Sequence, residues 1–204
     1  MKTQTKLDIK GFLKIWDPDT QEVLVDKTNA IHYENFSVAL ASCLADKTTR
    51  YIHEMHFGNG ASTVDPTGVI VYLPTNTSGT NADLYNKQYY KVIDDLSIHN
   101  NDPTRNKMEI RHVTGQSYTD ILITCLLDYG EPSGQDAFDN STDYNGTYVF
   151  DEIGIKGWNG TTVGGGDLLT HVVFNPVQKS LNRLIQIDYT IRIQALTNFV
   201  DNSV

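Results

Sequence analysis

Apolar and polar side chains alternate without interruption near the end of the chain, and this pattern constrains the fold more than any other. The apolar set is Ile185, Ile187, Tyr189, Ile191 and Ile193. A period of two belongs to a β-strand with one face buried and one face in solvent. Ile and Tyr also favour strands, because their side chains pack well on a pleated surface. The pattern predicts a half-buried antiparallel strand, and a sheet for it to join.

The same alternation recurs at the start of the chain. Apolar residues or glycine occupy every second position from Leu7 to Ile15, and the turn sequence Asp17-Pro18-Asp19-Thr20 follows. Pro presets φ in such turns, and Asp can accept hydrogen bonds from the turn amides. A return strand from Val23 would complete a hairpin. Further strands are predicted over 51–57, 69–73, 108–112 and 118–127, the last of them central and covered on both faces towards its end.

One segment has helical spacing. Its apolar residues fall on one stripe and are Phe36, Ala39, Leu40, Cys43 and Leu44. Asn29 is a candidate N-cap, since its side chain can accept a hydrogen bond from a first-turn amide. We expect the helix to end near Asp46. Cys43 and Cys125 are both flanked by leucine, and we expect them to be buried, reduced thiols.

These elements predict a mainly β, α+β fold with an antiparallel, sandwich-like core. A length of 204 residues suits one domain, or one domain with a small appendage. We expect an N-terminal hairpin or arm over 1–28 and a main β-rich domain over 29–204, which contains the helix at about 30–45. Polar loops are predicted over 75–81, 131–145 and 157–167, and the first of them should be exposed.

Composition excludes several classes of partner. Asp and Glu outnumber Lys and Arg by 25 to 16, so a nucleic-acid partner is not expected, because binding phosphates requires clustered basic residues. A membrane-spanning helix is not expected either, because the longest uncharged apolar run, 121–127, is far shorter than the ~20 residues needed. Charged residues replace the apolar stretch of a signal peptide, so we expect synthesis and folding in a cytoplasm.

No pattern of residues indicates an enzyme, a cofactor or a metal. His53 and His56 are three residues apart in a predicted strand, which would place them on opposite faces rather than at one metal. Neighbouring carboxylates, Asp94-Asp95 and Asp151-Glu152, would also diverge and could not flank a sugar as a catalytic pair unaided. One alternative stays open in the 131–145 loop. Its oxygen-bearing side chains could hold calcium, although the EF-hand pattern is absent, and they are Asp136, Asp139, Asp143 and Asn145.

Tyrosine is the most suggestive residue type in the chain. Eleven tyrosines are present, and most are explained by their preference for strands. Tyr85, Tyr89 and Tyr90 stand out because they follow a polar loop. Tyrosine supplies rigid, amphipathic contact area, which is favoured at protein interfaces. These three residues are therefore the candidate interface.

The order of several short motifs resembles a known family. The candidate helix precedes a strand ending in Gly58-Asn59-Gly60; Leu84-Tyr85-Asn86 follows a loop, and Glu152-Ile153-Gly154-Ile155 comes later, before a strand that begins at Leu168. This series resembles the N-terminal, virion-attaching domain of tail-collar and tail-fibre proteins of tailed bacteriophages. The positions that carry the resemblance are Gly58, Asn59, Gly60, Leu84, Asn86, Glu152 and Gly154. In this setting Gly154 would mark a bulge or a close backbone approach, and Glu152 would bond to a neighbouring amide or point outward.

The resemblance implies a non-enzymatic structural component of a virion, in the tail, baseplate or collar. Its partners would be other virion proteins, including fibres, and symmetric copies of itself. Such contacts could use loops, or strand addition at sheet edges. The alternatives are a capsid decoration protein and a module that binds host glycans through tyrosines. An enzyme that degrades envelope polysaccharide is a third.

Overall fold

The computed structural model describes residues 2–79, 81–133 and 149–200, and within these ranges it describes the side chains of residues 6–195. One helix, α1 (Tyr33–Leu44), and eleven strands form the described part. The strands are β1 (Lys2–Trp16), β2 (Val23–Ile31), β3 (Ile52–Gly58), β4 (Ser62–Val64), β5 (Ile70–Tyr72), β6 (Lys87–Val92), β7 (Lys107–His112), β8 (Tyr118–Leu127), β9 (Val149–Gly157), β10 (Leu168–Gln178) and β11 (Ile185–Val200). The predicted mainly β fold with one helix is confirmed.

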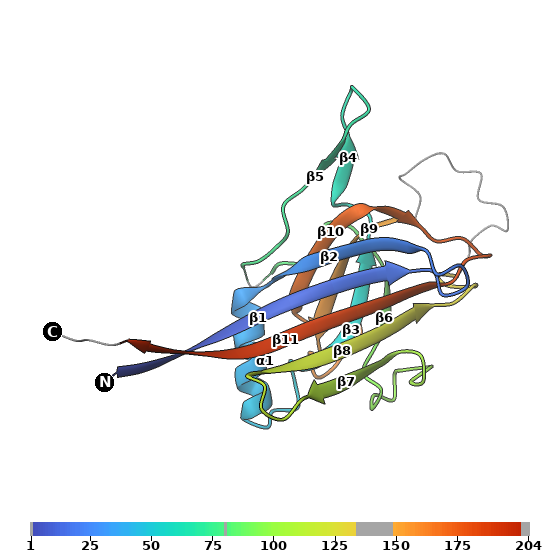
Figure 1. The fold of residues 1–204 in the computed structure, drawn as a ribbon. Coiled ribbons are helices and arrows are strands. Elements are labelled where there is room, and N and C mark those ends of the chain that lie inside the picture. The colour runs from blue at the N-terminus through green and yellow to red at the C-terminus, as the bar shows by residue number, and fades with distance from the viewer. Residues whose placement is uncertain (1, 80, 134–148, 201–204) are drawn as a thin grey trace.

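Nine strands form one curled antiparallel sheet in the order β6-β3-β9-β10-β2-β1-β11-β8-β7 (Figure 1). Strand β2 belongs to both halves, because Val23 to Asn29 pair with β1 whereas Ala30 and Ile31 pair with β10. The curl brings the halves face to face, as in a sandwich. The two remaining strands, β4 and β5, form a small hairpin that projects from the body (Figure 1).

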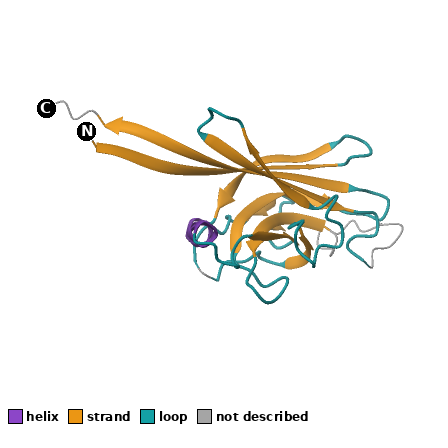
Figure 2. Cartoon of the chain, turned by 90° about the horizontal axis from the view of Figure 1, so that it is seen from below, coloured by secondary structure: helices purple, strands orange, loops and turns teal. Residues whose placement is uncertain are grey.

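The predicted terminal strand is β11, and it lies beside β1 along its whole length. Lys2 pairs with Val200 at one end of this ladder, and Trp16 pairs with Gln186 at the other. Strand β8 pairs with β11 only as far as Gln194, and β2 pairs with β1 only as far as Gly11. The first strand therefore lies in the middle of the sheet, and the ends of β1 and β11 leave the body as a two-stranded ribbon (Figures 1 and 2).

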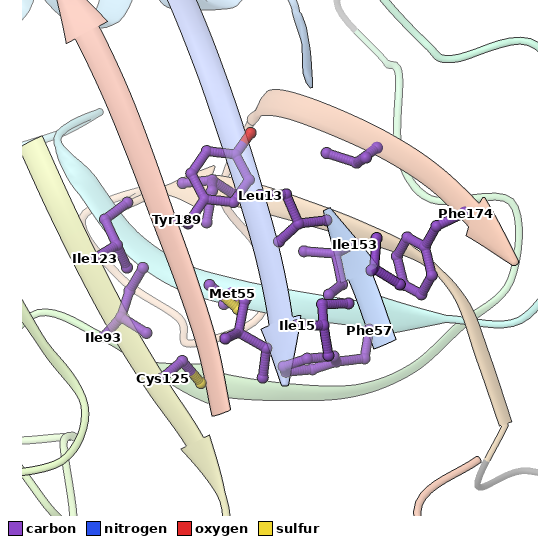
Figure 3. Close-up of a cluster of buried hydrophobic side chains, with 14 of the residues drawn as sticks. Leu13, Ile15, Met55, Phe57, Ile93, Ile123, Cys125, Ile153, Phe174 and Tyr189 are labelled. Atoms are coloured by element: carbon purple, nitrogen blue, oxygen red, sulfur yellow. The ribbon is translucent and has the colours of Figure 1, made fainter. Parts of the chain in front are cut away.

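The core fills the space between the two halves of the curled sheet. Figure 3 shows Leu13 and Ile15 from β1 facing Met55 and Phe57 from β3, with Tyr189 of β11 beside them. Each of these side chains is at most 2% exposed. The alternating residues predicted over 185–191 are all buried, whereas Ile193 is half-buried. Burying side chains of this size stabilises a fold by roughly 1.5–3 kcal/mol each, which is why the alternation decides the register.

The position of the helix was predicted, but its cap was not. His32 is the N-cap, because its Nδ1 accepts a hydrogen bond from the Asn35 amide at 3.2 Å. Its Nε2 therefore carries the proton and donates to the carbonyl of Gly79 at 3.1 Å. Asn29, the predicted cap, lies instead in β2 opposite Gly11. An alanine in place of Gly11 would collide with the Asn29 side chain. The helix ends at Leu44, close to the predicted Asp46.

Three further expectations need correction. The apolar stripe of α1 is only half covered: Phe36 and Ala39 are buried, but Cys43 is exposed, so its predicted burial is wrong. Strand β8 is buried towards its end, as predicted, but it is second from the edge of the sheet rather than central, and its first five residues are only half-buried. The 75–81 loop is half-buried at 75–77, because hydrogen bonds tie its backbone down. Cys125 is buried and both thiols are free, as predicted.

Candidate functional site

Several of the positions that carry the family resemblance meet around one buried carboxylate, that of Glu152 on β9. This side chain is fully buried on the face of the sheet opposite the core, under the loops that join β3 to β6. Oε1 accepts hydrogen bonds from the amides of Gly60 at 3.3 Å and Asn86 at 2.9 Å. Oε2 accepts from the amide of Tyr85 and from Nε2 of His171, both at 2.9 Å. The carboxylate therefore joins two separate loop segments to the sheet.

Hydrogen bonding keeps Glu152 ionised despite its burial. Burial alone would favour the neutral acid, but the bonds from His171 and from the amides of Asn86 and Tyr85 outweigh it, so the pKa of Glu152 is lowered. Nδ1 of His171 accepts a hydrogen bond from the amide of Asn76 at 2.8 Å. Nε2 of His171 is thus the donor to Glu152, and Nδ1 on the other side of the ring holds the 75–81 loop.

Glycine is required at the motif positions because loop and sheet approach too closely for a side chain. A Cβ on Gly58 would lie 2.4 Å from Oε1 of Glu152 and 2.8 Å from the carbonyl oxygen of Asn86. A Cβ on Gly154 would lie 2.6 Å from a methyl of Leu84 and from one of Leu168. The predicted close approach at Gly154 is therefore present. Asn59 and Asn86 complete the contact through their side chains, at 2.7 Å.

A second buried carboxylate, that of Glu54 on β3, lies between two histidines. Its oxygens bond to Nδ1 of His53 at 2.9 Å and to Nε2 of His56 at 2.7 Å, and the amide of Gly164 donates to it at 2.8 Å. Burial opposes ionisation, yet these three hydrogen bonds lower the pKa of Glu54 to about 2. The prediction that His53 and His56 face opposite ways is wrong, because a bulge between Ile52 and Glu54 interrupts the alternation.

The arrangement of His53, Glu54 and His56 differs from a metal site. One carboxylate occupies the space between the rings, and Nδ1 of His56 is buried without a hydrogen-bond partner in the described residues. Burial lowers the pKa of His56, which favours its neutral form. Within the described ranges, no three His, Cys, Asp or Glu side chains are placed to hold a metal ion. The calcium alternative, Asp136 to Asn145, lies outside the described residues.

The two carboxylate doublets have structural partners. Asp151 accepts from the amide of Ala61 at 3.1 Å and the hydroxyl of Ser62 at 2.5 Å, while burial raises the pKa of Asp151. The doublet of Asp151 and Glu152 thus anchors the segment that follows β3. Asp94 caps a turn by accepting from the amide of Leu96, and Asp95 accepts from the amide of Met108. The hydrogen bonds of these buried carboxylates attach loops to strands.

The three tyrosines of the candidate interface do not form one surface. Tyr89 faces the core and packs against Phe57, with ring centroids 6.2 Å apart. Tyr90 is on the opposite side of β6, 40% exposed and stacked on His56. Tyr85 is also exposed, and its hydroxyl donates to the carbonyl of Pro74. Tyr85 and Tyr90 therefore remain candidates for contact with a partner, and Tyr89 is a core residue.

Two concave regions were not predicted from the sequence. A polar cleft of about 590 Å³ lies between β6 and the 98–106 loop. An apolar groove of about 760 Å³ lies between α1 and strands β7, β8 and β11. The groove could have been suspected from the helix stripe, since Leu40 and Cys43 had no obvious partner. The cleft depends on the folding of a loop that carries no periodic signal.

Neither sequence nor structural similarity identifies a relative. No family model, curated protein or solved structure matches the chain. The helix α1 is too short to cross a membrane, and the described residues contain no other helix that could.

Proposed function

We propose that this chain is a non-enzymatic structural component of a tailed-phage virion, in the tail, baseplate or collar. Its partners are other virion proteins and copies of itself, and it is made and folded in the host cytoplasm before assembly. The resemblance of its motif order to tail-collar and tail-fibre attachment domains supports the virion assignment. Gly58, Gly60 and Asn86 lie against Glu152, Asn59 bonds to Asn86, and Leu84 lies beside Gly154. These contacts support that resemblance, because they give the order of the motifs a common structural role.

The observation that carries an assembly role is the ribbon of β1 and β11. Beyond Gly11 and Gln194 the strands of this ribbon pair only with each other within the described residues. Two strands alone are marginally stable in water, and unpaired edges are templates for strand addition. Such a ribbon is suited to pairing with a neighbouring subunit.

The test is to look for the chain in purified virions of the phage that encodes it. We expect mass spectrometry to detect it at a fixed stoichiometry, and chemical crosslinking to join it to tail, baseplate or collar proteins. Crosslinks to the major capsid protein would instead favour a decoration protein. Absence from purified, infectious virions would refute a structural role.

The polar cleft favours a second candidate function, the binding of a host glycan. Asn100 and Asn106 hold the cleft wall rigid through bonds to the backbone of Asp94, Asp102 and Leu126. A rigid wall lowers the entropic cost of binding. Tyr90, His99, Asn101 and Arg105 also line the cleft. A shift of the NMR signals of these residues on adding chitotetraose or maltotetraose, absent in Asn101→Ala, would support this function.

A further inference from the structure

Ser97 lies next to a histidine that is itself bonded to a buried carboxylate. The Oγ of Ser97 is 3.0 Å from Nε2 of His53, and Nδ1 of the same ring is 2.9 Å from Oε1 of Glu54. His53 and Glu54 are buried on β3, whereas Ser97 is half-buried in the loop between β6 and β7. A nucleophile, a base within hydrogen-bond reach and a third group that orients the base are the recurring parts of an activated serine.

The carboxylate determines where the protons of this array lie. Burial opposes the ionisation of Glu54, but the hydrogen bonds that it accepts lower its pKa to about 2, so Glu54 only accepts. Nδ1 of His53 is therefore the donor to Glu54. A His53 ring with a single proton leaves Nε2 to accept the proton of the Ser97 hydroxyl, while the amide of His99 donates to Oγ at 3.2 Å. In this arrangement a histidine can remove the proton of a serine.

Packing holds the His53 ring in this orientation. The ring lies against Trp158, with the centroids 4.4 Å apart, and meets Tyr51 edge to face. Only 1% of His53 is exposed, so water does not compete for its nitrogens. A base that is fixed by packing and by a second hydrogen bond needs little reorganisation when it takes a proton.

Ser97 also lines the apolar groove beside α1, whose volume is about 760 Å³. Apolar side chains from the helix and the sheet, such as Leu40 and Ile110, form its wall. A concave apolar wall suits an alkyl or acyl chain. Asp94 and Asp95 line the groove near Ser97, and Asp95 is exposed there. Their negative charge disfavours an anionic ligand and favours an uncharged one.

We propose that Ser97 is a nucleophile activated by His53, and that it takes the acyl group of an uncharged carboxylic ester whose acyl chain lies in the groove. Oγ forms a bond to the carbonyl carbon, and its proton moves to Nε2 of His53. The bond to the alcohol oxygen then breaks, and the alcohol leaves with that proton. Glu54 positions the ring and stabilises its charge in between. One acylation per chain is a covalent modification without turnover, so it goes beyond the proposed assembly role and is compatible with it.

An alkyl fluorophosphonate tests the nucleophile, because this reagent modifies activated serine hydroxyls and leaves ordinary ones unmodified. With an octyl chain on the reagent, we expect a single adduct per folded chain, and peptide mass spectrometry should place it on Ser97. Ser97→Ala should abolish the adduct. Ser117→Ala is the matched control and should retain it, because Ser117 is exposed and its hydroxyl contacts Gln194. A folded wild-type chain without an adduct on Ser97 overturns the proposal.

Loss of the base should slow the same reaction. His53→Gln should be labelled at least about 100-fold more slowly than the wild type, because general-base assistance supplies a factor of this order. Circular dichroism checks that the variant is folded. A folded His53→Gln protein that is labelled at the wild-type rate overturns the activation by His53.

Nitrogen-15 NMR of the histidines tests the array without a substitution at His53. At the pH of the labelling, Nδ1 of His53 should carry a proton and Nε2 should carry none. Glu54→Gln should slow the labelling and move the signal of the Nδ1 proton upfield, because a neutral amide is a weaker acceptor than a carboxylate. Protons on both nitrogens of the wild-type ring would leave no base for Ser97 and would overturn the proposal.

The alkyl chain of the reagent tests the groove. We expect the octyl reagent to react at least about tenfold faster than an ethyl one, because the longer chain buries more apolar area. Ile110→Asp should reduce this ratio and leave the ethyl rate unchanged. Ile98→Asp is the control and should change neither, since Ile98 lines the polar cleft instead. Equal rates with both reagents on the wild type overturn the placement of the acyl chain.

Discussion

Replacing Glu152 by Gln should destabilise the protein strongly, although the two side chains have almost the same shape. The four donors to Glu152 divide into two pairs, one pair on each oxygen. A Gln side chain presents one oxygen and one NH₂ group, so in either orientation two donors face another donor. His171 cannot relieve the conflict by exchanging its proton, because its Nδ1 must accept from the amide of Asn76.

The expected cost follows from those two unsatisfied donors. A buried donor left without an acceptor costs about 1–3 kcal/mol, and the two remaining bonds lose their charge assistance. Local relaxation recovers part of this, so we expect the free energy of unfolding to fall by about 2–4 kcal/mol. That is a large share of the roughly 5–15 kcal/mol of a typical domain.

Urea unfolding at pH 7 measures this difference, and hydrogen exchange locates it. The amides of Gly60, Tyr85 and Asn86 should exchange faster in Glu152→Gln, whereas those of β8 and β11 should follow global stability only. Glu109→Gln is the matched control, because Glu109 is exposed and its one ion pair among the described residues is with Arg111; its effect should stay within about 0.5 kcal/mol. A Glu152→Gln protein as stable as this control would refute the anchoring role of the carboxylate.

Three further predictions concern acid, glycine and cysteine. The pKa of Glu54 is lowered to about 2, so its ionised form stabilises the fold fully above the ordinary pKa near 4.5, and this stabilisation is lost as the pH falls towards 2. The wild-type protein should therefore lose about 2 kcal/mol more stability between pH 7 and pH 3 than Glu54→Gln does, as measured by urea unfolding. Gly58→Ala should lower the melting temperature more than Gly130→Ala, because the first Cβ meets Glu152 and the backbone of Asn86, whereas the second meets nothing and Gly130 has no left-handed φ; equal shifts would contradict the close approach. Titration with a thiol reagent should modify Cys43 in the native protein and Cys125 only after unfolding, because burial raises the pKa of Cys125 to about 12; rapid reaction of both would contradict the buried position.

The sequence predicts the strands because their signal is local. The alternation over 185–193 and the apolar run over 118–127 each need only the period of the strand and burial of one face, and both appear in the structure as β11 and β8. The expectation that Glu152 bonds to a neighbouring amide was one of two alternatives, and the structure selects it. The partners themselves, Tyr85 and Asn86, come from a strand-connecting loop whose path has no periodic signature.

The buried polar residues were harder to predict, because on a strand they look like a solvent-facing side. Glu54 and His56 occupy alternate positions of their strand, a polar pattern typical of a solvent-facing side, whereas both are buried. The missing information is the covering layer. Over Glu54 this layer is the loop that contains Gly164, and over His171 it is the 75–81 loop, which has no large apolar side chain to bury.

A loop of that composition can still dock if its backbone amides and carbonyls find buried partners. The Asn76 amide donates to His171, and the Gly79 carbonyl accepts from His32. The Gly164 amide donates to Glu54, and the amides of Tyr85 and Asn86 donate to Glu152. Buried carboxylates and histidines thus replace hydrophobic anchors, and the hydrogen bonds that they receive offset the cost of removing them from water. Polar loops and charged strand faces in the same chain are therefore complementary surfaces. The loops can lack apolar side chains because the strand faces offer buried hydrogen-bonding groups, and the strand faces can be charged because the loops cover them.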